Sequence, residues 1–265
     1  MAKKKDPSIT FLNKFGYNVV KLPRVGIEPM DIIGKDDTTQ WLGPLHSVWT
    51  STIPEPTPSA PHSAVAVNGQ KSDALDISLG IKVLANALAA FGASMPSLDM
   101  AYHQARKVQF AFTNVTSTVV APFEAGNYLA SGTLKTDNPV VKHYFVEPEA
   151  EAYLIVDVLK SDSITVTATD ERGAEVSVDV PAIQGVVGAK VAVKPSSAAN
   201  STITYTGTQP VTFGFVVQEI QRENDVWKLK GVQPSGDTAF GVRAQPSADG
   251  ADGSVILSSS CRLRV

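Results

Sequence analysis

Apolar and polar residues alternate along several stretches of this 265-residue chain. A period of two predicts β-strands with one buried face, and it is clearest at 106–114, 152–159 and 163–169. A tight turn at 170–173, followed by valines at every second position from 176 to 180, predicts a hairpin. Further strands are predicted at 16–22, 30–33, 187–194, 201–206, 211–220 and 226–230.

Helical patterns are confined to the middle of the chain. The clearest covers 73–91, where Asp73 can cap the first turn, Gly92 follows the last and Pro96 prevents continuation. Its apolar residues nearly encircle it, which predicts burial against other apolar surfaces. Shorter helices are predicted at 97–105 and 123–130. Helices flanked by strands predict an α+β fold, with helices around a central, twisted β-sheet that is mixed or largely antiparallel.

Strands with one apolar and one Thr/Ser-rich face, as at 163–169, have two uses. In most proteins they are half-buried in a sheet. In a membrane barrel the apolar side chains face lipid and the polar ones face the lumen. Periodicity alone favours the half-buried setting.

Two segments differ in composition from the rest. Residues 51–62 hold four closely spaced prolines, which predicts an extended surface loop, with an SH3-type ligand as the less favoured alternative. Residues 231–253 are rich in Gly, Pro, Ser and Asp, as in a linker open to proteases. We therefore divide the chain into a main domain at 1–238, a linker at 239–253 and a terminal peptide at 254–265.

The terminal peptide is too short to fold alone, although it has apolar side chains to bury. It is predicted to pack on the main domain, either as a last strand of the sheet or as a detachable inhibitory peptide. Its candidate inhibitory residues are Val255, Ile256, Leu257 and Leu263. Each aliphatic side chain buried there would contribute about 1.5–3 kcal/mol, so that release could reverse a two-state equilibrium.

Composition narrows the class of protein. With 43% hydrophobic and 18% charged residues the chain can build a core, and its net charge of -3 argues against a nucleic-acid partner. A single cysteine, Cys261, permits no internal disulfide, which indicates a reducing compartment. We expect Cys261 to be a small buried side chain. No secretory signal and no apolar window of about 20 residues is found, so a cytosolic protein is expected.

The charge is unevenly distributed. Residues 1–35 hold seven Lys or Arg and three acids, and the cations alternate with apolar and aromatic residues. Such a segment suits an anionic bilayer, where each cation contributes about 1 kcal/mol, or else it is an ordinary edge strand with solvated lysines. The candidate membrane contacts are Lys3, Lys4, Lys5, Phe11, Lys14, Phe15, Lys21 and Arg24.

No catalytic or cofactor motif is found. The four histidines do not cluster along the chain, and no phosphate loop, dinucleotide fingerprint or nucleophile elbow occurs. We therefore predict no enzyme, no cofactor and no metal, with a site assembled from distant residues as the weakest alternative.

Several short motifs resemble the bacterial gasdermins. They are Gly16-Tyr-Asn-Val-Val20, Leu22-Pro-Arg24, Glu28-Pro-Met30, Trp41-Leu-Gly-Pro-Leu45, Val108-Gln-Phe-Ala-Phe-Thr-Asn-Val115 and Asn127-Tyr-Leu129. The short tail after a Gly/Asp linker also resembles that family. The resemblance covers most of the chain and implies a gasdermin-like fold with a largely antiparallel sheet.

The resemblance also implies a mechanism. A cytoplasmic precursor, with its C-terminal peptide along the core, is cut by a caspase-like or trypsin-like protease. The freed domain then oligomerises on lipids of the inner membrane into a closed β-barrel and kills the infected cell, as antiphage defence. Candidates for the rearranging strands are 106–120, 151–180 and 187–206. One departure stands out, because many members have an acylated cysteine near the N-terminus and this chain has none there.

The cut is expected between residues 239 and 249. Arg243 would suit a trypsin-like protease, and Asp249 or Asp252 an Asp-specific one. The candidate residues of this window are Phe240, Arg243, Ala244 and Asp249. The competing hypothesis is a cytosolic β-rich binding or structural module, such as a phage-derived shell or scaffold protein, with the tail as its last strand.

Overall fold

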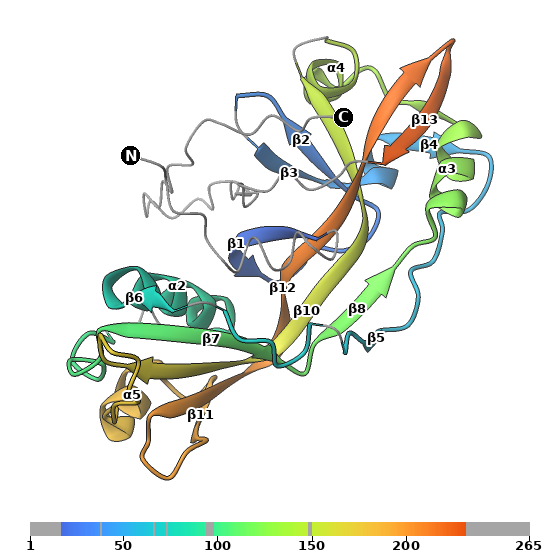
Figure 1. Cartoon of the computed structure of the whole chain (residues 1–265). Helices are drawn as coiled ribbons and strands as arrows, with labels where there is room; N and C mark the ends of the chain where they lie inside the picture. The colour runs from blue at the N-terminus through green and yellow to red at the C-terminus, as the bar shows by residue number, and fades with distance from the viewer. Residues whose placement is uncertain are drawn as a thin grey trace.

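Two long antiparallel strands run through the whole molecule (Figure 1). The computed structural model describes residues 17–37, 39–65, 67–72, 74–93, 98–147 and 150–231. Within these ranges eleven strands form one sheet, in which every pairing is antiparallel, and two more form a small separate ladder. The sheet with its surrounding helices confirms the predicted α+β fold.

The strands and helices have the following bounds. The strands are β1 (Asn18–Arg24), β2 (Asp31–Lys35), β3 (Thr39–Pro44), β4 (Trp49–Ser51), β5 (His62–Ser63), β6 (Leu75–Asp76), β7 (Lys107–Thr113), β8 (Thr116–Val119), β9 (Gly132–Leu134), β10 (Glu151–Thr169), β11 (Ala192–Pro195), β12 (Thr202–Glu223) and β13 (Val226–Gly231). The helices are the 3-10 turn η1 (Leu45–Ser47), α2 (Ile77–Ala90), α3 (Pro122–Ala130), α4 (Pro139–Phe145) and α5 (Val180–Val187).

Strands β10 and β12 form the central ladder. They contain 19 and 22 residues, so β10 alone spans about 60 Å. Each merges two predicted strands, 152–159 with 163–169 in β10 and 201–206 with 211–220 in β12. The ladder shifts register three times between Ile155 and Ser163. Such bulges let one strand continue through the stretch at which the sequence predicted that it would end.

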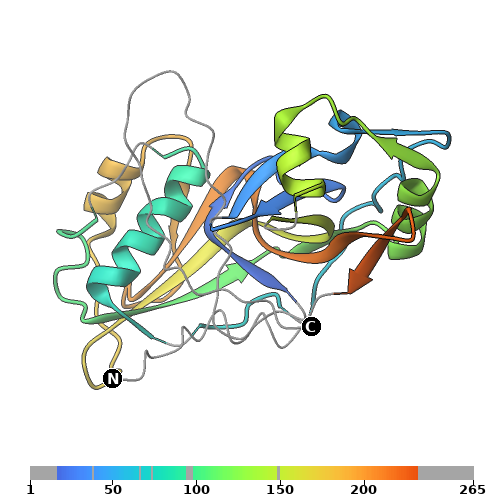
Figure 2. The ribbon, with the colours of Figure 1, turned by 90° about the horizontal axis from the view of Figure 1, so that it is seen from above.

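The helices gather at the two ends of this ladder (Figure 2). At one end α3 and α4 join a core around Trp49, whose ring meets that of Trp227 edge-on with centroids 5.3 Å apart. At the other end α2 and α5 contribute to a core with β7 and the adjoining halves of β10 and β12. The middle of the ladder is therefore the junction between two packed ends.

The clearest predicted helix is confirmed but is shorter than expected. It begins at Ile77, because Leu75 and Asp76 pair with β7 as β6. Asp73 lies outside the described residues, and Asp76 takes the N-cap position without a side-chain cap bond. Gly92 follows the last turn with a φ of +96°, as its place in the pattern predicted.

Two other helix or strand predictions were wrong, and a third was confirmed only in part. The described part of 97–105 forms turns, held by the Tyr102 N–H donating to the Leu98 carbonyl (3.1 Å). The valines after the 170–173 turn make one backbone bond to β10, from Val176 to Ala168, and no strand. The predicted strand at 187–194 is confirmed only in its last three residues, which belong to β11, because Val187 is the last residue of α5.

Capping explains α5 and also α4, which was not predicted. The carboxylate of Asp179 accepts from the Ala182 N–H (3.0 Å), with a proline in the first turn of α5. Asn138 and Pro139 begin α4 in the same way. A polar cap followed by proline is a helix-start signal, and here it outweighs the β-propensity of the valines that follow.

The other predicted helix, strands and loop that fall within the described residues agree with the structure. Helix α3 covers the predicted 123–130, and β1, β2 and β13 lie within two residues of their predicted starts. Residues 52–61 of the proline-rich segment contain neither helix nor strand, as expected.

Candidate functional site

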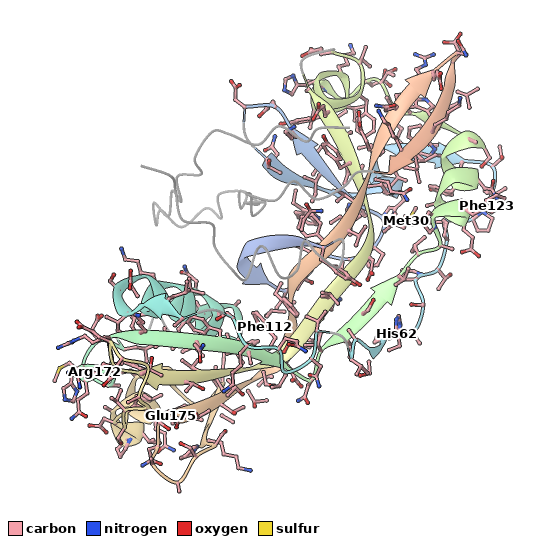
Figure 3. The ribbon with its side chains drawn as sticks, viewed as in Figure 1. Met30, His62, Phe112, Phe123, Arg172 and Glu175 are labelled. Carbon is pink, nitrogen blue, oxygen red and sulfur yellow. The ribbon has the colours of Figure 1, made fainter. Side chains whose placement is uncertain are left out.

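The candidate site is a three-strand region in which the apolar faces coincide. Ile164 of β10 lies opposite Phe112 of β7 and Tyr205 of β12, and Val166 lies opposite Phe110 and Ile203. These side chains belong to one buried cluster or pack against it. We call β7 with residues 163–169 and 202–206 the amphipathic end of the sheet; in Figure 3 Phe112 and Arg172 mark its extent.

The opposite face of the amphipathic end carries hydroxyl groups. Thr165 meets Thr204 with 2.9 Å between hydroxyl oxygens, and Thr167 meets Thr202 at 3.2 Å. Ser163 and Thr113 are also in hydroxyl contact. The registers of three strands therefore separate an apolar face from a hydroxyl face over several consecutive pairs, which alternation within one strand could not establish.

Helix α2 sits closely on the apolar face. A Cβ atom on Gly80 would lie 2.0 Å from Cγ2 of Val108 and 3.5 Å from its Cβ, so only glycine permits this approach. In the same core the hydroxyls of Tyr102 and Tyr205 lie 2.7 Å apart, and burial raises the pKa of both phenols. Helix α2 therefore covers the apolar face closely. It would have to move away before that face could contact another apolar surface.

A second apolar cluster contains residues of strands and turns only. Its members are at most 1% exposed and come from β2, β10, β12 and the turn before β2: Ile27, Ile33, Tyr153, Ile155, Val158, Phe215 and Val217. In the described parts of the chain, no helix contributes a buried residue to it. We call it the strand-only cluster.

The middle of β10 connects these regions through polar side chains. Asp157 accepts hydrogen bonds from Tyr17 and Ser117, and Lys160 pairs with Glu28. The hydroxyl of Ser161, which is fully buried, donates to the Thr113 carbonyl (2.5 Å). These side-chain bonds join strands where the bulges interrupt the regular ladder.

A histidine network joins α4 to the turn after β2. His143 Nδ1 lies 2.7 Å from Glu147 and Nε2 lies 3.2 Å from Asp36, which also accepts from the Tyr144 hydroxyl (2.8 Å). Hydrogen bonds that the imidazole donates to Glu147 and then to Asp36 raise the pKa of His143 above its usual 6.5. When it is protonated, the imidazole can donate to both carboxylates and so links α4 to the residues after β2.

We expect His143→Gln to lower the melting temperature more at pH 6 than at pH 8.5. A pKa raised by folding gives stability that is fully present below the unfolded pKa and is lost as pH rises through the folded value. Thermal unfolding of both proteins at the two pH values measures this. His103→Gln is the control, because His103 bonds to the Met100 carbonyl (2.8 Å). An equal loss at both pH values would contradict the assignment.

Most site residues proposed from sequence lie outside the described residues. These are Lys3, Lys4, Lys5, Phe11, Lys14, Phe15, Phe240, Arg243, Ala244, Asp249, Val255, Ile256, Leu257 and Leu263. Lys21 and Arg24 belong to β1, whose backbone pairs with β12, but their side chains are not described. All of these assignments remain predictions.

Sequence reasoning missed Asp157, its two donors and the close approach of Gly80. Their partners are far away along the chain, so no local signal marks them. In the described residues no helix is long and apolar enough to cross a bilayer. The same residues contain no group of three or more His, Cys, Asp or Glu side chains placed to hold a metal ion.

The fold is similar to that of a solved bacterial gasdermin from Bradyrhizobium tropiciagri, with a TM-score of 0.66 over 91% of this chain and 97% of that one, at 17% identity. This likeness places the molecule among proteins of the gasdermin fold. The Bacterial Gasdermin Family matches residues 20–232. The chain is 40% identical to gasdermin bGSDM of Vitiosangium sp. (strain GDMCC 1.1324) over 92% of its length and 93% of that protein's.

A second relative, gasdermin bGSDM of Lysobacter enzymogenes, is 31% identical over 93% of this chain and 92% of its own. The chain belongs to the bacterial gasdermin family, which confirms the resemblance found in its motifs. Gasdermins are pore-forming, non-enzymatic proteins, so membership supports a role as a pore-forming precursor that self-associates and interacts with membrane lipid.

Proposed function

We propose that the chain is an autoinhibited precursor whose C-terminal peptide is removed by a protease, after which the main domain assembles into a β-barrel pore. The observation that carries this proposal is the shared register of β7, β10 and β12, which gives one apolar and one hydroxyl face. In a barrel the apolar face would contact lipid and the hydroxyl face the water-filled lumen.

The strands must lengthen to do this. A membrane-spanning strand needs about 9–11 residues, whereas β10 contributes seven, 163–169, to the amphipathic end. Residues 170–180 and 187–201, which join β10 to β12, can supply more once α5 and its flanking turns open. Closure into a barrel is required because a bilayer leaves unpaired backbone groups unsatisfied.

The inhibitory peptide needs an apolar partner on the main domain, and we assign it the strand-only cluster. The described helices contribute no buried residue to this cluster. Three or four aliphatic side chains would contribute about 1.5–3 kcal/mol each. Cutting the linker lowers the effective concentration of the peptide and permits release.

The biological setting that we propose follows from the family. The precursor resides in the cytoplasm, a caspase-like or trypsin-like protease cuts between residues 239 and 249, and the pore opens in the inner membrane. Permeabilisation then kills the infected cell and limits phage spread. The N-terminal cations would support binding to anionic lipid.

Dye release from liposomes of bacterial lipid tests this function. A specific protease site is inserted next to Arg243, and the same protein is measured before and after cutting. We expect rapid release only after cutting, with the uncut protein and the protease alone as controls. A cut protein that stays folded and releases no dye would contradict the pore and favour the binding or structural module.

A further inference from the structure

Tyr17, the residue immediately before β1, is joined to the centre of the sheet through the carboxylate of Asp157. The Tyr17 hydroxyl donates to Oδ2 of Asp157 (2.5 Å), across 140 positions of sequence. On the other side of β10, the Ser117 hydroxyl donates to Oδ1 (2.6 Å). Asp157 therefore holds Tyr17 and strand β8 at the same time.

The geometry makes these bonds strong. Hydroxyl-to-carboxylate distances of about 2.5–2.7 Å are typical of charge-assisted hydrogen bonds. Tyr17 is half-buried against a cluster that includes Leu159 and Phe213, which shields the bond from water. Burial, and then Asp157, raise the pKa of the Tyr17 phenol, so it remains a donor throughout the physiological range.

Asp157 is also placed at an irregular point of β10. The β10–β12 register shifts between Ile155 and Asp157, and it shifts again at Leu159 and Ser161. A bulge re-aims the side chains beside it. Strand β1 adds few backbone pairs of its own, since its ladder to β12 is broken between Val19 and Arg24. The Tyr17 bond thus supplements a weak ladder.

We propose that Asp157 is a latch that holds Tyr17 and the start of β1 on the sheet of the precursor, and that opening the Tyr17–Asp157 bond precedes membrane insertion. The proposal rests on the proposed function and adds a regulatory contact to it. The residues before Tyr17 include six of the eight predicted membrane contacts, so opening the latch would release the point of the sheet to which they are joined.

Hydrogen–deuterium exchange of the full, uncut chain tests the latch directly. We expect Tyr17→Phe to speed exchange of the backbone amides of β1 by about 10- to 100-fold, the range expected for a hydrogen bond to a charged group. Asp157→Asn should act in the same direction. Tyr144→Phe is the matched control, because it removes a similar bond, to Asp36, at the far end of the sheet.

Dye release by the cut proteins tests the coupling to insertion. We expect cut Tyr17→Phe to release dye with a shorter lag than the cut parent chain, and cut Tyr144→Phe to match the parent. Unchanged exchange of β1 in Tyr17→Phe would overturn the latch, and faster exchange with an unchanged lag would overturn its control of insertion. Should the cut parent chain release no dye, the proposed function fails, while exchange still decides whether Asp157 holds β1.

Discussion

A disulfide between positions 80 and 108 is expected to abolish dye release by the cut chain, and reduction is expected to restore it. A Cβ atom on Gly80 would lie 3.5 Å from the Cβ of Val108, within the range for disulfides. Val108→Cys also removes the methyl group that a Cβ atom at position 80 would overlap. Once bonded, α2 cannot leave β7, so its cover over the apolar face becomes permanent.

The experiment uses Gly80→Cys and Val108→Cys together with Cys261→Ser, which removes the chain's own cysteine. Dye release after cutting is compared with and without a reductant on the same preparation. Val108→Cys alone in the Cys261→Ser background, treated with the same oxidant, controls for side reactions; Gly80→Cys alone is not used, because its Cβ would overlap the Val108 methyl. Release by the fully oxidised protein at the parent rate would show that α2 stays on β7 in the pore.

Leu257→Asp is expected to make the uncut chain permeabilise membranes. Burial of a leucine contributes about 1.5–3 kcal/mol, and an unpaired carboxylate in an apolar site adds several kcal/mol of desolvation penalty. A loss of about 3 kcal/mol shifts an equilibrium more than 100-fold, enough to release the peptide without proteolysis. Dye release by the uncut variant and growth of bacteria that express it measure the effect.

The neighbouring serine provides the control. Ser258→Asp adds the same charge one position away on the same peptide. We expect this variant to release no dye until the linker is cut. If the folded, uncut Leu257→Asp chain releases no more dye than the parent, Leu257 does not take part in the inhibitory contact. Equal leakage from both variants would indicate that charge alone loosens the peptide.

Local patterns predicted elements well where one signal dominated. The alternation from Val108 to Phe112 identified β7, and the apolar run ending before Gly92 identified α2. Competing signals produced the errors. The valines at 176–180 have strand propensity, but Asp179 and the proline after it begin a helix. Leu98 and Tyr102 have helical spacing, yet they fill the core from consecutive turns.

The sequence by itself determined the class of fold, the family, and the existence of strands with one apolar and one hydroxyl face. These follow from residue spacing within a few positions and from motifs such as Trp41-Leu-Gly-Pro-Leu45. Only the tertiary structure decided that the apolar faces of three strands coincide, that Val108 packs directly against Gly80, and that Tyr17 bonds to Asp157. The reason is that register and bulges depend on pairing between residues far apart in the chain, whereas alternation is a property of each strand alone.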